Sequence, residues 1–371
     1  MNQFNMGQVI QQKRKEKGLT QEELASAMGV SKSSVSKWET GQTYPDIYLL
    51  PELATFFSIT IDTLMAYQPN LTKQEINSIY SELSLRFGSE DFETVFEDYE
   101  KLVKKYYASQ PFLLQMAVLL INYFHLVDPM HHQEMYEYII NLTKRVKEET
   151  TEASLMSQAN ILEAFCQLQS GNIDEALSLL NYDVTIYMGE EQILSKAYAA
   201  KGDIRKAQEV LQVTQYQYLM ALIITSSDEL LYEVNQPDKF NEIIRRVREL
   251  VRTFELERLH PFLVLTFLNS VFLGYTQQFR YKEALDVMEE IVDLMVKQVF
   301  PIELHGDDYF YLLENWMKEQ LHFNNNMPRD EKTIKESLIQ FFETHPGIVT
   351  AYQGNQRYEQ LIKQLKENKG D

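Results

Sequence analysis

Apolar residues recur at spacings of three and four along most of the chain, which is the pattern of helices with one buried face. Gly, Pro, Asn or Asp marks most of the breaks, as at Gly171-Asn172 and Gly202-Asp203. No alternating strand pattern persists, so the sequence predicts an all-α protein. Beyond residue 71 the predicted helices span 72–87, 90–107, 111–127, 131–149, 152–170, 173–181, 190–200, 203–212, 214–234, 238–254, 258–277, 280–299, 307–322, 330–344 and 355–368.

The segment from residue 20 to residue 45 predicts two short helices joined by a glycine turn. Thr20 is a good N-cap and Glu23 is placed to complete a capping box, so the first helix should begin at Gln21. Gly29 supplies the positive φ of the turn, and Ser31 can cap the second helix. This is the arrangement of a helix-turn-helix that reads DNA.

The second of these helices has an apolar face and a polar face. Trp38 falls on the inward face with Val35, so we expect it to pack in the core. The opposite face presents short polar and basic groups where a major groove would lie. These groups belong to Lys32, Ser33, Ser36, Lys37 and Thr40. The two lysines either read bases or contact phosphates, which fix position without reading sequence.

Residues 6–66 resemble the XRE-type, lambda-repressor-like helix-turn-helix family. The matching positions are Gly7, Ile10, Arg14, Gly18 to Gln21, Leu24-Ala25, Gly29 to Ser31, Val35-Ser36, Trp38-Glu39, Gly41, Pro45, Leu53-Ala54 and Ile59. The resemblance implies a five-helix domain in which Arg14 pairs with Glu39, although two solvated charges are the alternative. It also implies that Gln21 holds a phosphate or a base edge and that Lys32, Ser33 and Lys37 read bases. The expected DNA contacts are therefore Gln21, Ser31, Lys32, Ser33, Ser36, Lys37 and Thr40, with structural roles for Arg14, Glu39, Trp38 and Gly29.

The charge of the chain is unevenly distributed. The formal net charge is −19, which by itself argues against a nucleic-acid partner. Residues 1–45, however, carry six Lys or Arg against four Asp or Glu, so the predicted reader is locally positive. An acidic body behind such a reader repels DNA non-specifically, which favours a specific regulator over a protein that coats DNA.

A domain boundary is predicted where the family resemblance ends. We expect a DNA-binding domain over residues 1–67, a linker over 68–71 and a helical-repeat domain over 72–371, because Thr72 and Glu75 open a new capped helix. Cys166 is the single cysteine, which excludes an intramolecular disulfide. No secretory signal or membrane span is evident in the sequence, so we expect a cytoplasmic protein.

Three stretches of the body look alike, namely 161–177, 193–211 and 269–287. Each has small residues on both helices of a hairpin, and the first two turn at Gly-Asn or Gly-Asp, whereas the third has Phe279 where Gly is expected. This is similar to tetratricopeptide repeats, so we expect a right-handed superhelix of TPR-like hairpins.

A DNA reader joined to such repeats resembles the peptide-responsive quorum-sensing regulators known as the RRNPP superfamily. The resemblance implies a homodimer on a near-palindromic operator, gated by a short imported peptide held on the concave repeat surface. The expected peptide contacts are Phe165, Gln169, Lys196, Asn269, Leu273 and Gln277, in which the amides would bind the peptide backbone. Solvated polar residues and core packing are the alternative interpretations. The acidic body weakly favours a peptide with a basic residue.

Enzyme functions are not indicated by the sequence. His131-His132 points to different sides of a helix, and no Cys or carboxylate set completes a metal site, so we expect no cofactor, no metal and no catalytic residue. Two other functions remain open beside a peptide-gated regulator. The repeats could serve dimerisation or protein docking without a small effector, or the chain could be an adaptor that titrates a partner protein.

Overall fold

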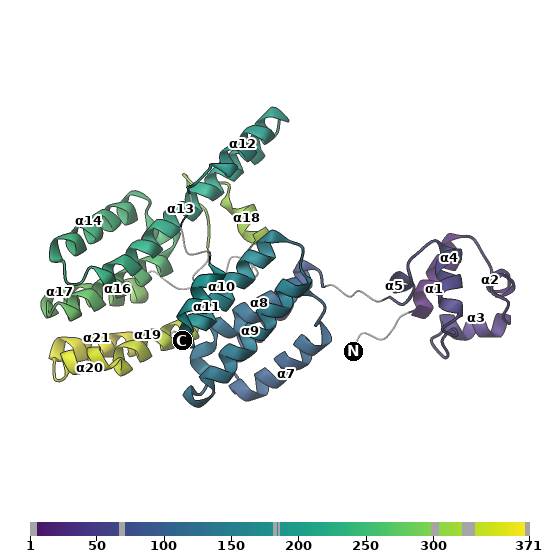
Figure 1. The fold of residues 1–371 in the computed structure, drawn as a ribbon, viewed down its shortest axis with the longest axis horizontal. Helices are drawn as coiled ribbons and strands as arrows, with labels where there is room; N and C mark the ends of the chain where they lie inside the picture. Colours follow the sequence, from purple (N-terminus) through teal and green to yellow (C-terminus); the bar gives the residue numbers. More distant parts are fainter. Residues whose placement is uncertain are drawn as a thin grey trace. The chain divides into compact units, whose positions relative to one another are not determined.

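The computed structural model describes residues 6–66, 71–180, 184, 186–297, 304–320 and 331–367. Every regular element in these ranges is a helix, which confirms the all-α fold class (Figure 1). Backbone contacts divide the chain into two units: Met1–Thr72 with Tyr106–Ser109, and Lys73–Lys105 with Gln110–Asp371. Most of the predicted linker at 68–71 lies outside the described residues. None of the described helices has the length and apolar character needed to cross a membrane.

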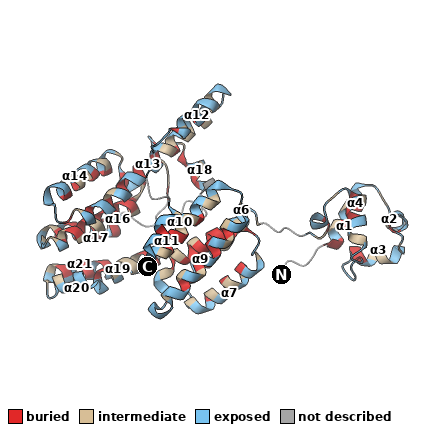
Figure 2. Ribbon diagram, viewed as in Figure 1, coloured by how far each residue is buried: buried red, intermediate tan, exposed pale blue. Residues whose placement is uncertain are grey.

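The first unit contains the five helices that the resemblance implies. They are α1 (Met6–Glu16), α2 (Gln21–Ala27), α3 (Lys32–Glu39), α4 (Leu49–Phe57) and α5 (Ile61–Leu64). Each helix contributes a fully buried side chain to one core, namely Ile10, Leu24, Val35, Leu53 and Leu64. The buried stretches of this unit are red in Figure 2. Packing of these apolar side chains in one core therefore fixes the positions of α2 and α3 within the unit.

The turn between α2 and α3 forms as its residues predict. Thr20 and Glu23 make the capping box, with the Thr20 backbone N–H donating to Glu23 Oε2 at 2.7 Å, and α2 begins at Gln21. Gly29 has a φ of +66°, and Ser31 Oγ accepts from the Ser34 backbone N–H at 3.1 Å at the start of α3. Local capping chemistry thus sets both helix starts.

The second unit begins with consecutive helices that pack against their neighbours. They are α6 (Lys73–Phe87), α7 (Phe92–Lys105), α8 (Gln110–Asn122), α9 (His132–Glu149), α10 (Ala153–Gln169) and α11 (Ile173–Leu179), with short 3-10 turns η1 (Phe124–Leu126) and η2 (Pro129–His131) before α9. Contacts join α8 to α9, α9 to α10 and α10 to α11. The short connections from α9 to α10 and from α10 to α11 make these neighbours antiparallel, and the α10–α11 pair is the hairpin that the repeat pattern predicts over 161–177.

The rest of the second unit encloses a larger apolar core. Its helices are α12 (Glu190–Ala200), α13 (Ile204–Tyr232), α14 (Pro237–Thr253), α15 (Leu256–Leu259), α16 (Pro261–Gln277), α17 (Tyr281–Lys297), α18 (Leu313–Gln320), α19 (Glu331–Thr344), α20 (Pro346–Tyr352) and α21 (Gln356–Glu367). The α16–α17 hairpin lies beside α19, α20 and α21 (Figure 1). Phe272 of α16 contacts the Phe342 ring of α19, so two segments far apart in sequence share this core.

One predicted break is wrong. The apolar pattern predicts separate helices over 203–212 and 214–234, but α13 is a single helix of 29 residues from Ile204 to Tyr232. No Gly or Pro lies at the expected break, and Val213 is buried in the core. The Thr214 hydroxyl donates to the Val210 carbonyl oxygen at 2.8 Å, which keeps this side chain within the helix. Burial of Val213 therefore stabilises a helix that continues past the predicted break.

All three predicted hairpins form, as α10–α11, α12–α13 and α16–α17. Gly171 and Gly202 adopt φ values of +80° and +85° at the first two turns. Phe279, which replaces glycine in the third, is also left-handed at +59°. The hairpins do not stack in simple succession, because α13 packs against α16 whereas α10 and α12 have little contact in the described chain.

A buried histidine makes the stability of this unit depend on pH. His260 caps α16, because its Nδ1 accepts from the Leu263 backbone N–H at 3.2 Å, and burial lowers the pKa of His260 to about 4. Since the unfolded histidine titrates near 6.5, the unfolded chain binds the proton more tightly, and stability falls as pH decreases from 6.5 towards 4. We expect this histidine to account for a loss of about 2–3 kcal/mol over that window.

Comparing denaturant unfolding of the wild type with that of His260→Asn checks this expectation. Asparagine keeps a side-chain cap but has no proton to gain, so the variant should lose less stability between pH 6.5 and 4.5. Identical pH profiles for the two proteins would contradict the assignment.

Candidate functional site

The α3 helix presents a polar face to solvent and an apolar face to the core. Lys32, Ser33 and Lys37 are exposed and Ser36 is half-buried, whereas Trp38 is buried. The residues expected to read DNA therefore lie together on the free face of α3. Lys32 Nζ lies 3.3 Å from Glu22 Oε2 in an exposed pair, which bound phosphate can displace at little cost.

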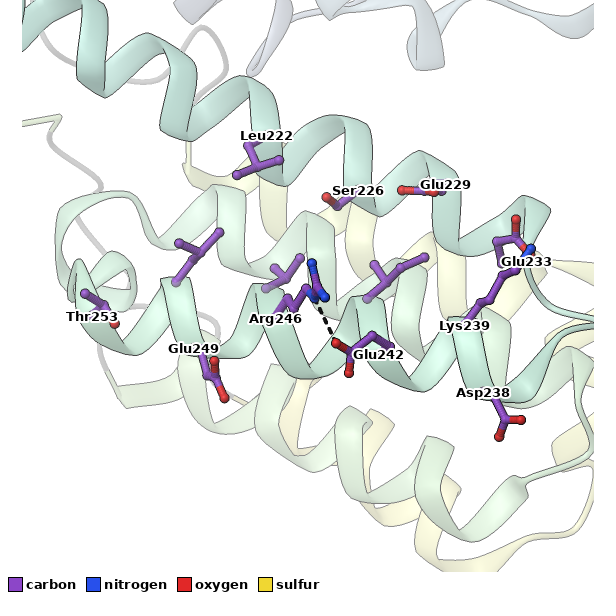
Figure 3. Close-up of a pocket in the computed structure, with 13 residues that line it drawn as sticks. Leu222, Ser226, Glu229, Glu233, Asp238, Lys239, Glu242, Arg246, Glu249 and Thr253 are labelled. Carbon is purple, nitrogen blue, oxygen red and sulfur yellow. Dashed lines mark hydrogen bonds and ion pairs between the residues drawn. The ribbon is translucent and has the colours of Figure 1, made fainter.

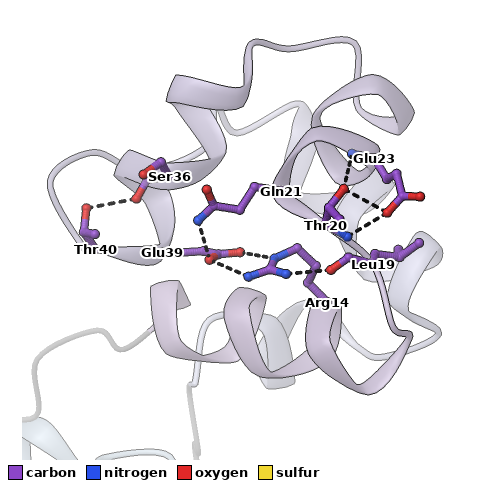
Figure 4. Close-up of polar contacts among 8 residues, drawn as sticks. All are labelled: Arg14, Leu19, Thr20, Gln21, Glu23, Ser36, Glu39 and Thr40. Atoms are coloured by element: carbon purple, nitrogen blue, oxygen red, sulfur yellow. Dashed lines mark hydrogen bonds and ion pairs between the residues drawn. The ribbon is translucent and has the colours of Figure 1, made fainter.

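Hydroxyl groups at both ends of α3 are partly committed to local bonds. Ser31 Oγ lies 2.8 Å from Ser33 Oγ, and the Thr40 hydroxyl donates to the Ser36 carbonyl oxygen at 3.0 Å (Figure 4). Thr40 has therefore given its only hydrogen to the backbone. It can accept a hydrogen bond from a DNA base, but it can donate to a phosphate only by breaking the bond to Ser36.

A buried ion pair joins α1 to the end of α3. Arg14 Nε donates to Glu39 Oε1 at 2.6 Å and Arg14 Nη2 to Glu39 Oε2 at 3.0 Å, so the pairing implied by the resemblance is present (Figure 4). Burial alone would raise the pKa of the Glu39 carboxyl, but hydrogen bonds from Arg14 and Gln21 hold that pKa below its ordinary value. The hydrogen bond to Glu39 likewise raises the pKa of Arg14.

The same carboxylate orients Gln21. Gln21 Nε2 donates to Glu39 Oε2 at 2.9 Å, and its amide oxygen points away from this contact (Figure 4). Gln21 sits at the first position of α2, directly after the Thr20 cap. The network therefore fixes α1, α2 and α3 relative to one another and presets the side chain that the resemblance assigns to DNA.

The six residues expected to bind a peptide differ in how far they are buried. Phe165, Gln169 and Lys196 are exposed on α10 and α12, and Gln277 is exposed on α16. Leu273, in contrast, is half-buried and packs against the core of the second unit. The sixth residue, Asn269, is half-buried and lines a cavity.

This cavity lies between α16, α17 and α19 and has a volume of about 210 Å³. We call it the Asn269 cavity. Its lining residues are Phe262, Leu265, Thr266, Asn269, Met295, Ile334, Ser337, Leu338 and Phe341. Asn269 Oδ1 and Ser337 Oγ are buried and have no hydrogen-bond partner. The repeat register predicts Asn269 as a site residue but not Ser337, because nothing in the sequence places α19 beside α16.

A larger groove of about 880 Å³ separates α13 from α14 (Figure 3). We call it the α13–α14 groove. Leu222, Ile243, Val247 and Leu250 contribute its apolar surface. Five acidic residues line it, Glu229, Glu233, Asp238, Glu242 and Glu249, against two basic ones, Lys239 and Arg246. This groove was not predicted from the sequence, although the acidic residues recur at helical spacings on both helices.

Other reactive groups in the described ranges have structural surroundings. Cys166 is buried, and burial raises the pKa of its thiol to about 12, so it is a poor nucleophile. His131 pairs with Glu134 on the surface at 3.0 Å. In the described parts of the chain, no three His, Cys, Asp or Glu residues are grouped as a metal site.

Two solved structures align with most of the chain at low similarity. PlcR of Bacillus thuringiensis, solved with the peptide PapR7 and DNA, is 13% identical, with 98% of this chain and 96% of PlcR covered and a TM-score of 0.24. The PrgX/iCF10 complex is 13% identical, with 88% of this chain and 99% of PrgX covered and a TM-score of 0.28. Scores this low do not establish a common fold.

Matches to the first unit are more specific. The helix-turn-helix family model matches residues 10–64. The HTH-type transcriptional activator BcrR of Enterococcus faecalis is 44% identical over 66 residues, which are 18% of this chain and 32% of BcrR, so the chain spans about a third of that relative. The HTH-type transcriptional regulator SinR of Bacillus licheniformis is 32% identical over 107 residues, which are 27% of this chain and 96% of SinR.

Both relatives are transcription regulators rather than enzymes. SinR is matched over almost its whole length by a part of this chain, and the α2–α3 pair with its free polar face has the geometry of a DNA reader. The chain therefore belongs to the XRE-type helix-turn-helix family of DNA-binding transcription regulators.

Proposed function

We propose that this regulator binds a near-palindromic operator as a homodimer, with α3 of each copy in a major groove. The polar face of α3 supports this proposal, since Lys32, Ser33 and Lys37 are exposed together while the Arg14–Glu39 pair holds the helix in place. Gln21, Ser31, Ser36 and Thr40 complete the proposed contact set. Two-fold symmetry would place the half-sites one helical turn apart, about 34 Å, or a multiple of it.

Lys37 provides the direct test of base reading. If Lys37 contacts a base edge, Lys37→Ala should weaken operator binding by about 1–3 kcal/mol and relax specificity at one base pair. Fluorescence anisotropy with single-base operator variants, selected first with the wild-type full-length protein, measures both effects. An equal loss of affinity for every operator variant would instead indicate that Lys37 contacts a phosphate. Lys15→Ala, an exposed change on α1, is the matched control.

The helical domain, residues 72–371, is the proposed site of effector binding and dimerisation. A short peptide bound there would set the affinity for DNA in the cytoplasm, as in the quorum-sensing regulators whose architecture the sequence resembles. The observation that carries this proposal is the Asn269 cavity, because Asn269, which is expected to bind a peptide backbone, lines it together with apolar residues of α16, α17 and α19. Phe165, Gln169, Lys196, Leu273 and Gln277 are proposed as further contacts on the helices that surround the bound chain.

Native mass spectrometry of the protein purified from its own host tests peptide gating. A dimer that carries a peptide-sized mass, lost on denaturation, supports the proposal. The recovered peptide should then change the operator affinity of the wild type, whereas Asn269→Ala should bind DNA normally without peptide and respond less to it. A peptide that binds but leaves operator affinity unchanged would reject gating.

A second function is favoured by the α13–α14 groove. Its apolar floor and acidic rim fit a basic amphipathic helix of a protein partner, so the repeats would act as a docking surface without a small effector. This alternative predicts a protein that co-purifies with the wild type but not with Glu229→Lys, and no stabilisation by peptide. If the Glu229→Lys variant retains the same partner, the α13–α14 groove is not the docking site.

A further inference from the structure

Helix α13 carries apolar side chains on two sides, but the described chain packs only one of them into a core. Leu219 and Ile223 belong to the buried side. The other side has an apolar stripe with spacings of four and seven residues, whose side chains are between 38% and 55% exposed. We call it the outer stripe, and it consists of Ile204, Leu211, Tyr218 and Leu222. A helix that is apolar on both sides is normally covered on both, so the outer stripe indicates a further contact.

The two ends of the outer stripe carry opposite charges. Lys201, in the turn before α13, and Arg205 are exposed at its N-terminal end. Glu229 is exposed at its C-terminal end, on the same side of α13 as Leu222 (Figure 3). Within the described ranges, neither Arg205 nor Glu229 takes part in an ion pair. Each end of the stripe therefore presents charge that is free to pair with a partner molecule.

The apolar and charged positions are complementary to a second α13 that runs antiparallel. When Leu211 of each copy lies opposite Leu222 of the other, the two-fold axis crosses the middle of the stripe. The same register brings Arg205 of each copy to the level of Glu229 of the other. Two-fold symmetry forms each of these contacts twice. A parallel pair in register would instead place like charges together, so the pattern favours the antiparallel arrangement.

The α13–α14 groove provides space for the second helix. Leu222 contributes to its apolar surface, and Glu229 belongs to its acidic rim. In the antiparallel register, the N-terminal turns of the second α13 lie along this groove, with Leu211 on the apolar surface and Arg205 at the rim. Five acidic residues line the groove against two basic ones, so the basic end of α13 matches it in charge.

We propose that the outer stripe is the dimer interface of this protein, on which α13 of a second copy packs antiparallel. Leu211 of each copy contacts Leu222 of the other, and Arg205 of each copy pairs with Glu229 of the other. This inference rests on the proposed function, in which the helical domain dimerises, and it names the surface that does so. The chain's own helix then occupies the groove in which the docking alternative places a helix of another protein.

Charge reversal at the two ends tests this interface. Arg205→Glu and Glu229→Arg each place like charges opposite one another twice per dimer, so each variant should raise the dimer dissociation constant at least tenfold. The double variant restores opposite charges and should dimerise as the wild type does. Sedimentation velocity of the full-length proteins measures the dissociation constants. Lys144→Glu, an exposed reversal on α9, is the matched control and should leave the constant unchanged.

Mixing the two single variants separates an intermolecular contact from an effect on folding. A heterodimer of Arg205→Glu with Glu229→Arg has opposite charges at both ends, whereas either homodimer has like charges at both. We therefore expect the mixture to dimerise about as tightly as the wild type, although neither variant does so alone. Wild-type dimerisation by both single variants, or no recovery on mixing, overturns the inference.

The failures of the two proposals are distinguishable. If the wild type dimerises and both single variants do so equally well, the α13 interface fails and the homodimer stands. If charge reversal controls dimerisation but the dimer binds a near-palindromic operator no more tightly than a single half-site, the interface stands and the operator proposal fails. A wild type that stays monomeric with and without DNA overturns both, and leaves the groove to another partner.

Discussion

Replacing Arg14 with alanine is expected to lower the free energy of unfolding of the helix-turn-helix unit by about 3–5 kcal/mol. The Glu39 side chain is only 1% exposed, and Arg14 supplies two of its hydrogen bonds, so the variant leaves a carboxylate buried with little compensation. The guanidinium also donates to the Leu19 carbonyl oxygen at 2.6 Å, and this bond is lost as well. Hydrogen exchange of the α1, α2 and α3 amides in the full-length protein measures the loss.

Two further variants decide whether the buried pair is the cause. Lys13→Ala breaks an exposed pair on the same helix, in which Lys13 Nζ lies 2.7 Å from Glu16 Oε2, and should cost less than about 1 kcal/mol. Arg14→Met combined with Glu39→Leu replaces both charges with apolar groups, so it should recover most of the stability lost by Arg14→Ala. If Arg14→Ala costs no more than Lys13→Ala, the pair is not a structural element.

The helix-turn-helix was predictable because its signals are local. The Thr20 cap, the Glu23 capping box and the left-handed Gly29 each depend on residues within one turn of the chain, and all three are present in the structure. Arg14 and Glu39 are separated by 25 residues, and their pairing came only from the family resemblance. The helix starts could thus be predicted from neighbouring residues, whereas the Arg14–Glu39 ion pair could be predicted only from the resemblance to a known family.

The second unit was predictable only as a set of helices. Repeat hairpins could be recognised from small residues and glycine turns, but which hairpins touch depends on packing between distant segments. Ser337 faces the same cavity as Asn269 although 68 residues separate them, and no spacing in the sequence records that proximity. The α13–α14 groove is formed by residues of two predicted helices, 214–234 and 238–254, but how these helices pack against each other is not recorded in their spacing.

Gly7→Ala is expected to destabilise the helix-turn-helix unit by about 3 kcal/mol, even though alanine is the better helix former. A Cβ atom at Gly7 would lie 2.2 Å from the Trp38 carbonyl oxygen and 3.2 Å from the Glu39 carbonyl oxygen, whereas ordinary van der Waals contact begins near 3.4 Å. The obstructing atoms belong to the backbone, so no rotamer change relieves the clash, and α1 must move away from the end of α3.

That displacement also affects DNA binding, because the end of α3 carries the Glu39 carboxylate that orients Gln21. We therefore expect Gly7→Ala to weaken operator binding even at temperatures where the variant remains folded. Anisotropy titrations and hydrogen exchange on the same preparation measure both effects. Lys15→Ala, on the exposed side of α1, should alter the unfolding free energy by no more than about 0.5 kcal/mol. Wild-type stability in Gly7→Ala would mean that α1 and α3 can separate freely, and that α3 is positioned by the α2 turn alone.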